Sequence, residues 1–416
     1  MLRYAQRDKL SLSIRFHFVR NFDLVPKQLF ASVRPKYLLQ AAINSISVYT
    51  MRANMNKSSP RKEDAPRILV IRFRFIGDVL LVTPVFEALR RHWPHCYLAF
   101  VTDAEAAAVV EGHPALDELM VFRLPKKQLR SRWARLQHKM RLFQHMRQQH
   151  FDIAINLHPG QRGALTAWLS GARRRVGYDR PQDKLENALT NIKVPYRLAT
   201  AQPREYRVEY LLDTVRALGI EAKATLPSMG LSYEDRAFAT SYLKSLAFDR
   251  DGPLIVLHPG RPSTRKTWPD GRFTQLADAL SQRFAARIIW LGAPAEVERV
   301  KRIAGAMTHT SASVAGQANL KQLAAIIEQA DLFIGIDSGP MHIASAVGTP
   351  TVALFAFADP NEWNPPGATH IAIHKPLPDH PCDPPQCCEV GKSLCMANIY
   401  VNDVLAAAER LLNKGE

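Results

Sequence analysis

The sequence predicts an α/β protein made of two parallel α/β domains that face one cleft. Short apolar runs of strand length alternate with amphipathic segments of helix length through both halves of the chain. Several of these runs end in small and polar residues, as expected at the carboxyl ends of parallel strands, where such sheets bind ligands. A length of 416 residues is sufficient for two hydrophobic cores.

The composition is typical of a soluble globular protein, with 47% hydrophobic and 22% charged residues. No apolar run reaches the roughly 18 residues that a membrane-spanning helix needs. The first 22 residues lack the uninterrupted apolar core of a signal peptide, and five cysteines do not indicate a secreted disulfide scaffold. We therefore expect a cytoplasmic protein. Its net charge of +17 favours an anionic partner: nucleic acid, anionic lipid or a phosphorylated substrate.

Residues 1–66 are predicted to form a basic N-terminal extension. Residues 1–67 carry 13 Lys and Arg against four acids, and residues 26–49 resemble an amphipathic helix. Two interpretations stay open. The extension is either a basic, partly apolar arm for the cytoplasmic membrane surface, or a loosely ordered segment that ends in the linker NMNKSSPRKEDAP.

The first domain is predicted to span residues 67–248, and it opens with the strand RILVIRFRF followed by a helix over residues 76–94. Gly77 is the single glycine at this junction, so the G-x-G-x-x-G fingerprint of NAD dehydrogenases is absent. Asp78 follows at the carboxyl end of the strand, where a catalytic carboxylate would lie in such a sheet. The alternative is that Asp78 only caps the helix.

The middle of the first domain contains a strongly cationic segment. Residues 123–147 hold nine Lys and Arg and no acid, on a predicted helix whose apolar stripe is Leu129, Trp133, Leu136, Met140 and Phe143. This face suits substrate phosphates or anionic lipid, or it is simply solvated. No zinc finger, basic zipper or RNA-binding signature accompanies it, so nucleic acid is not an expected partner.

A further strand ends at His158, and this histidine and Arg162 are expected at the edge of the cleft. Predicted helices over residues 207–218 and 233–246 then lead to a polar, turn-rich break at residues 249–253. We predict the domain boundary there.

The second domain is predicted to span residues 249–416. Its first strand, PLIVLHPG, leads to Lys266 and a helix, and alternating strands and helices follow as far as the stretch DLFIGIDSGPMHIASAVGTPTVALF. This stretch indicates a strand, a tight turn at residues 337–339, a short helix with Pro340 and His342 in its first turn, and a second strand. Backbone N–H groups at such a helix start suit an anionic ligand. An ordinary βαβ turn with an Asp or Ser cap is the alternative.

Three segments together resemble glycosyltransferase family 9, the lipopolysaccharide heptosyltransferases: RFRFIGDVLLVTPVFEALR, HPGRPSTRKTWP and GIDSGPMHIASAVGTPTVALF. The resemblance covers roughly residues 67–412, and the basic extension is most similar to the heptosyltransferase III branch. It implies a GT-B architecture, in which two Rossmann-like domains face a central cleft. It also implies inverting transfer of a heptose from a nucleotide-activated donor, ADP-heptose, to the lipopolysaccharide inner core, with no metal or other cofactor.

Carried over position by position, the family's functional residues correspond to a general base at Asp78, a phosphate-contacting lysine at Lys266, a ribose-binding acid at Glu296, and a donor loop of Asp337, Ser338, Gly339 and His342. The chemistry of these residue types agrees, because transfer needs a base for the acceptor hydroxyl and positive charge for the leaving diphosphate. Residues 261–264 depart from the family's Thr-Thr pattern, which leaves phosphate contacts there open.

The expected partners are therefore the nucleotide-sugar donor, the lipopolysaccharide core acceptor and, peripherally, the cytoplasmic face of the inner membrane. A nucleotide-sugar-binding GT-B protein of other activity, epimerase-like or specific for a different sugar, is the alternative. Cys382, Cys387, Cys388 and Cys395 lie within 14 residues but lack a C-x2-C pair. Both a zinc site and reduced structural thiols are open interpretations of this cluster.

Overall fold

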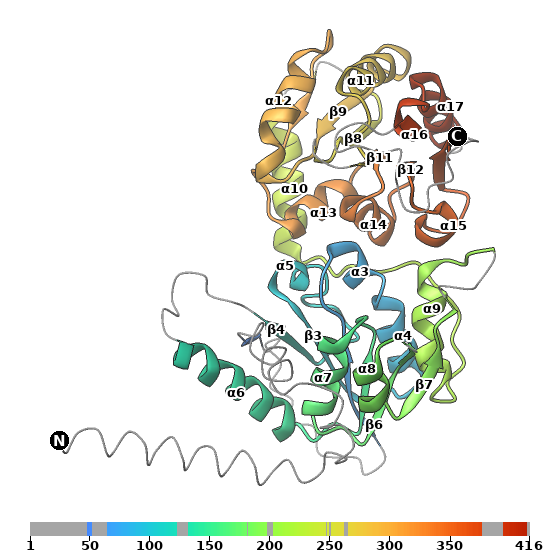
Figure 1. The fold of residues 1–416 in the computed structure, drawn as a ribbon. Helices are drawn as coiled ribbons and strands as arrows, with labels where there is room; N and C mark the ends of the chain where they lie inside the picture. The colour runs from blue at the N-terminus through green and yellow to red at the C-terminus, as the bar shows by residue number, and fades with distance from the viewer. Residues whose placement is uncertain are drawn as a thin grey trace, which may run out of the picture.

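The chain forms two α/β halves, each with its own parallel sheet, which lie one above the other (Figure 1). The structure is a computed structural model. It describes residues 65–122, 132–180, 182–197, 203–246, 251–261, 265–376 and 394–413, residue 248, and the backbone of residues 48–51. The α/β class and the predicted architecture of two Rossmann-like sheets are confirmed.

The first sheet has seven strands in the order β1-β4-β3-β2-β5-β6-β7. They are β1 (Val48–Met51), β2 (Arg67–Ile71), β3 (Tyr97–Asp103), β4 (Glu118–Phe122), β5 (Ile153–Asn156), β6 (Arg174–Asp179) and β7 (Ile192–Pro195). All neighbours are parallel except β1, which pairs antiparallel with β4. The central strands are apolar on both faces because helices cover both sides of the sheet. Their carboxyl ends therefore meet at one edge, which faces the second half.

The helices of this half are α3 (Ile76–Leu80), α4 (Thr83–His92), α5 (Ala104–Ala107), α6 (Arg132–Gln148), α7 (Gln161–Leu169), α8 (Lys184–Leu189) and α9 (Arg207–Arg216). The single helix predicted over residues 76–94 is wrong, since α3 and α4 are separate. Pro84 lies in the first turn of α4, where a residue without an N–H fits a helix start better than a helix interior.

Two residues of the predicted stripe are not at the centre of the packed face of α6. Among the described side chains of this helix, Leu142 and Met146 are the buried ones, and they pack with Phe151 on one side of the first sheet. Met140 and Phe143, which the stripe included, are only half-buried. Its other members, Leu129, Trp133 and Leu136, have side chains outside the described residues. The buried face follows an i, i+4 pair that begins one position before Phe143.

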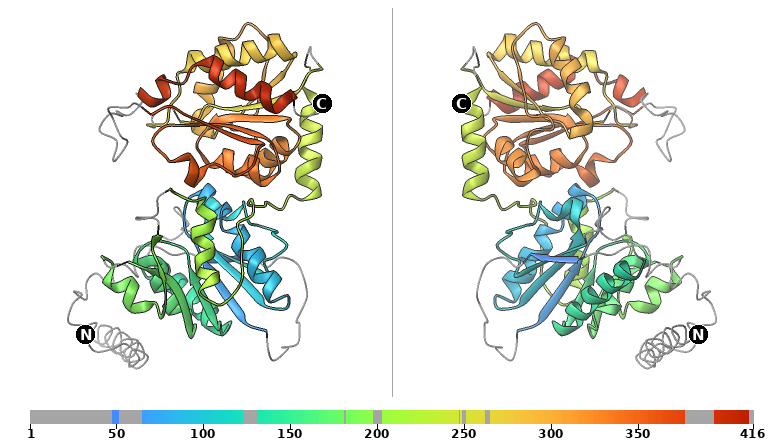
Figure 2. Two further views of the ribbon diagram at one scale, coloured as in Figure 1. Left: turned by 90° about the vertical axis from the view of Figure 1, so that its right-hand side faces the viewer. Right: turned by 90° about the vertical axis from the view of Figure 1, so that its left-hand side faces the viewer.

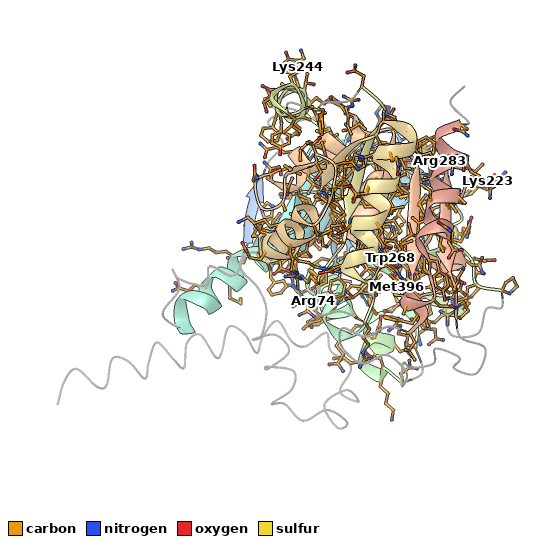
Figure 3. All side chains as sticks on the ribbon, turned by 90° about the horizontal axis from the view of Figure 1, so that it is seen from above. Arg74, Lys223, Lys244, Trp268, Arg283 and Met396 are labelled. Carbon is orange, nitrogen blue, oxygen red and sulfur yellow. The ribbon has the colours of Figure 1, made fainter. Side chains whose placement is uncertain are left out.

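The second sheet has six strands, all parallel, in the order β10-β9-β8-β11-β12-β13. They are β8 (Leu254–His258), β9 (Arg287–Trp290), β10 (Ala312–Ser313), β11 (Leu332–Ile336), β12 (Thr351–Phe355) and β13 (His370–His374). The helical segments are α11 (Asp270–Phe284), the 3-10 turn η3 (Pro294–Glu296), α12 (Val297–Gly305), α13 (Leu320–Glu328), α14 (Gly339–Ala346), α15 (Pro360–Trp363), α16 (Leu394–Ala397) and α17 (Val401–Leu412). Trp268 and Met396 are buried together in the core of this half (Figure 3).

Helix α10 (Tyr233–Ser245) lies along the second half (Figure 2). It packs against α13, and Arg236 on α10 is paired with Glu328 on α13 at 2.8 Å. The predicted boundary at residues 249–253 lies beyond this helix. We therefore propose that the chain passes between the halves within residues 217–232.

Much of the predicted N-terminal extension lies outside the described residues, but its residues 48–51 form β1 and so belong to the first sheet. Among the described helices, none is long and apolar enough to cross a membrane. Three cysteines of the late cluster lie outside the described residues, whereas Cys395 is buried. Within the described ranges, no group of three or more His, Cys, Asp or Glu is placed to hold a metal ion.

Candidate active site

The two halves touch where α3 faces the start of α14 (Figure 1). Glycines make this approach possible. A Cβ on Gly77 would lie 2.6 Å from Cδ2 of His342, and one on Gly339 would lie 3.2 Å from Cγ2 of Ile76. The carboxyl-end loops of β2 and β11 are thereby brought together, and with them most of the predicted site residues.

Asp78 lies in the first turn of α3 and is held by a buried arginine. Arg72, which directly follows β2, donates from Nη2 to Asp78 Oδ1 at 2.5 Å and from Nη1 to the carbonyl of Leu157 at 2.5 Å. The side chains of Arg72 and Asp78 are 6% and 17% exposed. Asp78 is therefore not a helix cap: it is an oriented carboxylate whose Oδ2 has no hydrogen-bond partner among the described residues.

The turn that presents Asp78 has an unusual backbone. Arg74 has a φ of 49°, in the left-handed region that non-glycine residues rarely occupy. This conformation turns the chain sharply from β2 into α3. Such local strain is often found at functional sites.

Lys266 and Asp337 form the main ion pair on the second half. Lys266 Nζ donates to a carboxylate oxygen of Asp337 and, at 3.3 Å, to the carbonyl of the same residue. Asp337 is almost buried, whereas the Lys266 side chain is 28% exposed. The segment is anchored two residues later, because the indole of Trp268 donates to the carbonyl of Ile399 at 3.0 Å. Lys266 is thus a positioned cation with access to the cleft.

A second polar chain connects Ser338 to Glu296 through His258. The Ser338 hydroxyl lies 3.3 Å from Nδ1 of His258, and Nε2 of His258 lies 3.4 Å from Glu296 Oε2. Burial by itself would raise the pKa of Glu296, but hydrogen bonds from His258 and from the Ala293 N–H outweigh it and lower that pKa. Glu296 is thus an ionised acceptor at the carboxyl edge of the second sheet.

His342 lies between the two halves and is buried. Burial lowers its pKa; Asp337 and Asp78 oppose this shift, and Lys266 adds to it. The electrostatic influence of both carboxylates on one ring indicates how closely the two halves bring Asp78 and Asp337 together. The imidazole is neutral at physiological pH, and its Nδ1 has no hydrogen-bond partner among the described residues.

Comparison with known proteins gives the family. Residues 139–392 match the sequence profile of glycosyltransferase family 9 (heptosyltransferase), which is more than half of the chain. The chain belongs to glycosyltransferase family 9. The predicted family and the predicted class of enzyme, a glycosyltransferase, are confirmed.

Relatives of this family 9 glycosyltransferase include lipopolysaccharide heptosyltransferase 3 of Escherichia coli, 26% identical over 70% of this chain and 84% of the relative. Lipopolysaccharide heptosyltransferase 1 of Pseudomonas aeruginosa is 24% identical over 76% and 86%. The solved structure of the glycosyl transferase family 9 from Veillonella parvula is similar with a TM-score of 0.72 and 26% identity, over 84% of this chain and 98% of that one. E. coli ADP-heptose lps heptosyltransferase II shares the fold, with a TM-score of 0.67 and 20% identity over 84% and 99%.

Arg162 and His158, the residues predicted at the edge of the cleft, have different surroundings in the structure. Arg162 binds both oxygens of Asp103, at 2.6 and 3.1 Å. Burial, together with the charges of Arg72 and Arg162, lowers the pKa of His158 to about 3. His158 is therefore a neutral ring that accepts a proton poorly at physiological pH.

Several residues of the site were missed in the sequence. Arg72 lies in the predicted strand RILVIRFRF and His258 in PLIVLHPG, and neither was predicted as a site residue. The motif LHPG occurs at the carboxyl end of a strand in both halves, at residues 157–160 and 257–260, and this repetition was an available signal. Glu362 was also missed; it accepts from Arg204 at 2.6 Å and from Arg207 at 2.7 Å, across the two halves.

Proposed function

We propose that this family 9 glycosyltransferase transfers a heptose from ADP-heptose to the inner core of lipopolysaccharide, with inversion at the anomeric carbon. The names of its relatives support the heptose and the lipopolysaccharide, and the name of a structural neighbour supports ADP-heptose. One observation carries the proposal. Asp78 from the first sheet and the Lys266–Asp337 pair from the second converge at the contact between α3 and α14.

The base in this proposal is Asp78. Its Oδ1 is held by Arg72, so Oδ2 is left to accept the proton of an acceptor hydroxyl. The hydroxyl oxygen attacks the anomeric carbon as the bond from that carbon to the phosphate oxygen breaks. Attack from the face opposite the nucleotide inverts the configuration, and a base and a leaving group on opposite halves of the protein suit that geometry.

The leaving diphosphate is met by positive charge on the second half. Lys266 lies beside the carboxyl end of β11, and the first N–H groups of α14 begin at Gly339. Both stabilise negative charge as it develops on the phosphate oxygen. We assign Asp337, Ser338 and Glu296 to hydrogen bonds with hydroxyl groups of ADP-heptose.

Incubation of the protein with ADP-heptose and truncated core acceptors tests this function. The expected product is an acceptor heavier by one heptose residue, and NMR of the new anomeric centre should give the configuration opposite to that of the donor. Retained configuration would contradict inversion. Epimerised or hydrolysed ADP-heptose without any transfer would contradict the transferase function on this acceptor.

We also propose that the enzyme works at the cytoplasmic face of the inner membrane, which it binds peripherally. A lipid-anchored acceptor requires it to reach that surface. Residues 1–67 and 123–147 together hold 22 Lys and Arg and four acids, a charge that favours anionic headgroups.

A further inference from the structure

A small hollow adjoins Asp78 in the first half, at the carboxyl ends of β2, β5 and β6 and against α9. Its polar lining consists of Arg72, Tyr178, Arg180, Tyr196 and Arg207. Its enclosed volume is about 10 Å³, and it opens to solvent. A cavity of this size holds about one water molecule, so the hollow suits a single oxygen atom of a charged group whose remaining atoms lie outside it.

The hollow carries positive charge that the protein does not fully neutralise. Arg72 is paired with Asp78, but its Nε is buried without a hydrogen-bond partner. Arg207 shares the single carboxylate of Glu362 with a second arginine, Arg204. Three arginines in and beside the hollow, Arg72, Arg204 and Arg207, are therefore paired with only two carboxylates.

Arg180 is the remaining cation. Its guanidinium stacks 4.0 Å above the ring of Tyr196, and its Nε is buried without a partner. The charge of Arg180 acts on the carboxylate of Glu186, but Glu186 accepts its hydrogen bond from the Gly160 N–H, at 3.1 Å. Within the described residues, Arg180 has no side-chain hydrogen bond and no ion pair.

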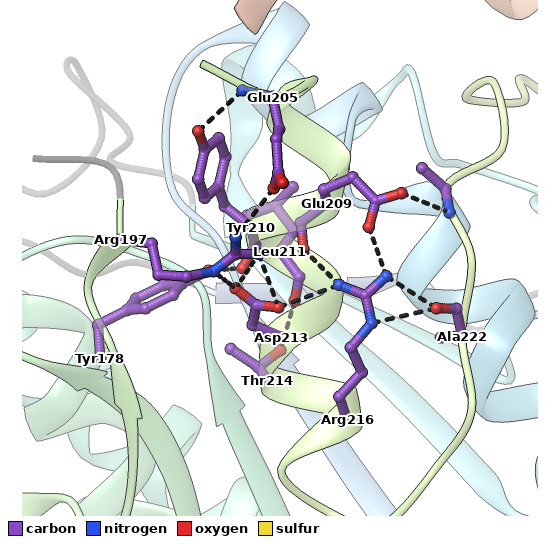
Figure 4. A network of polar contacts seen from close by, with 11 residues as sticks. Tyr178, Arg197, Glu205, Glu209, Tyr210, Leu211, Asp213, Thr214, Arg216 and Ala222 are labelled. Atoms are coloured by element: carbon purple, nitrogen blue, oxygen red, sulfur yellow. Dashed lines mark hydrogen bonds and ion pairs between the residues drawn. The ribbon is translucent and has the colours of Figure 1, made fainter. Parts of the chain in front are cut away.

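The walls of the hollow are held by a network on α9 (Figure 4). The Tyr178 hydroxyl donates to the carbonyl of Tyr210 at 2.8 Å. Arg197, which follows β7, binds both oxygens of Asp213, and Asp213 also accepts from Arg216 at 3.0 Å. Tyr178, one wall of the hollow, is therefore fixed to α9 before any ligand binds.

We propose that this hollow binds an oxygen atom of a phosphate or carboxylate group of the acceptor. The inference rests on the proposed function. The N–H donors of a guanidinium lie in one plane and match the oxygen atoms of phosphate and of carboxylate. The Nε atoms of Arg180 and Arg72 are both buried without a hydrogen-bond partner and can donate to such an oxygen.

The position of the hollow indicates which sugar of the acceptor carries the charged group. Arg72 contacts Asp78 with one nitrogen and lines the hollow with the same guanidinium, which is only a few ångströms wide. An anion in the hollow is therefore close to the hydroxyl that Asp78 deprotonates. It follows that the charged group belongs to the sugar that receives the heptose or to its immediate neighbour.

The test compares wild type with Arg180→Ala, Arg180→Lys and the control Arg174→Ala. Arg174 is the exposed first residue of β6, whereas Arg180 directly follows the last residue of that strand. We expect Arg180→Ala to raise the KM for intact acceptor at least ten-fold, with the KM for ADP-heptose unchanged, and Arg180→Lys to lie between it and wild type. The assay is repeated on phosphatase-treated and on carboxyl-reduced acceptor. The treatment that abolishes the difference between Arg180→Ala and wild type identifies the bound group.

An equal KM for intact acceptor in Arg180→Ala and Arg174→Ala would overturn the inference, as would a difference that survives both treatments. If wild type transfers no heptose, the proposed function fails, and calorimetric titration of the same acceptor then decides on the hollow. Weaker binding by Arg180→Ala than by Arg174→Ala would support the subsite, and equal binding would overturn it.

Discussion

Lys266 is the residue whose charge we expect to matter in both donor binding and chemistry. Its ammonium is paired with Asp337 and is partly open to the cleft. Changing it to alanine removes the cation for the diphosphate and leaves an almost buried carboxylate without its partner. We expect Lys266→Ala to weaken ADP affinity at least ten-fold and to lower kcat as well, since the charge grows as the bond breaks.

Calorimetry with ADP and steady-state kinetics measure the two effects. Lys301→Ala is a matched control, because Lys301 is exposed on α12 and is paired with Glu298, three residues before it. If Lys266→Ala kept both the ADP affinity and the turnover of wild type, Lys266 would have no role in donor binding or in the chemistry.

His113 gives the stability of the protein a dependence on pH. It is buried beside Phe86 and lies 3.0 Å from the Ser228 hydroxyl. Burial, together with the charge of Lys321, lowers its pKa from 6.5 to about 4. In the unfolded chain His113 is therefore protonated below about pH 6.5, whereas in the folded protein it stays neutral down to about pH 4. Stability falls over that window, by at most about 1.4 kcal/mol per pH unit from this residue.

Urea unfolding at pH 7.5 and pH 5 tests this linkage. The midpoint should fall less between the two pH values in His113→Gln than in wild type, although the glutamine variant is less stable at pH 7.5. Burial also lowers the pKa values of His158 and His370, so part of the fall should remain. The same fall in both proteins would exclude His113 as a source.

At the level of elements, the contact between α3 and α14 is the feature that assembles the site. A methyl group on Gly77 would meet the buried His342 ring at 2.6 Å, so the two helices could not approach as they do. We expect Gly77→Ala to lower the transfer rate at least ten-fold while both halves stay folded. Kinetics and circular dichroism measure the two properties.

Gly271→Ala is the control for this substitution. Gly271 lies in the first turn of α11, and a Cβ there would meet nothing within 4 Å. Alanine should be tolerated there and favour the helix slightly. Wild-type rates in Gly77→Ala would mean that the close approach of α3 and α14 is not needed for transfer.

Elements with a clear periodicity could be predicted from the sequence. The strand, turn, helix and strand over residues 331–355 were expected and occur as β11, α14 and β12. The position of α10 could not be predicted, because its amphipathic pattern does not say which half it packs against. Likewise, the sequence of α6 predicts an apolar face but does not show which of its residues the fold buries. Which of its neighbouring residues is fully buried depends on the sheet beneath it.

The same limit applies to the candidate site. Asp78, Lys266 and Asp337 follow from motifs that end strands. The ion pair between Lys266 and Asp337, 71 residues apart, and that between Arg207 and Glu362, 155 apart, depend on tertiary structure. Arg72 was visible in the sequence, but nothing there showed that it would be buried against Asp78.

At the scale of the whole molecule, polar bridges connect the halves on two sides of the contact. Glu362 on α15 binds Arg204 and Arg207 of the first half. Lys321 on α13 donates to the carbonyl of Glu111 at 2.6 Å and to that of Gly230. These bridges hold the two sheets so that their carboxyl edges face each other.

The charge distribution of the whole chain predicts how it binds membranes. Binding through residues 1–67 and 123–147 would be mostly Coulombic, and such attraction is screened beyond about 8 Å at physiological salt. We expect the protein to float with anionic vesicles at low salt, less at high salt, and not with neutral vesicles. Equal flotation with both vesicle types, or none with either, would remove the membrane proposal.

The central claim is that Asp78 of one half deprotonates an acceptor for a donor held by the other half. The most direct test is single-turnover transfer by Asp78→Asn, with ADP-heptose affinity measured on the same preparation. Asparagine keeps the shape and can still lie beside Arg72, but it cannot take the proton. We predict a loss in rate on the order of 10²–10⁴-fold, with donor affinity nearly unchanged. Transfer at a near-normal rate would contradict the claim.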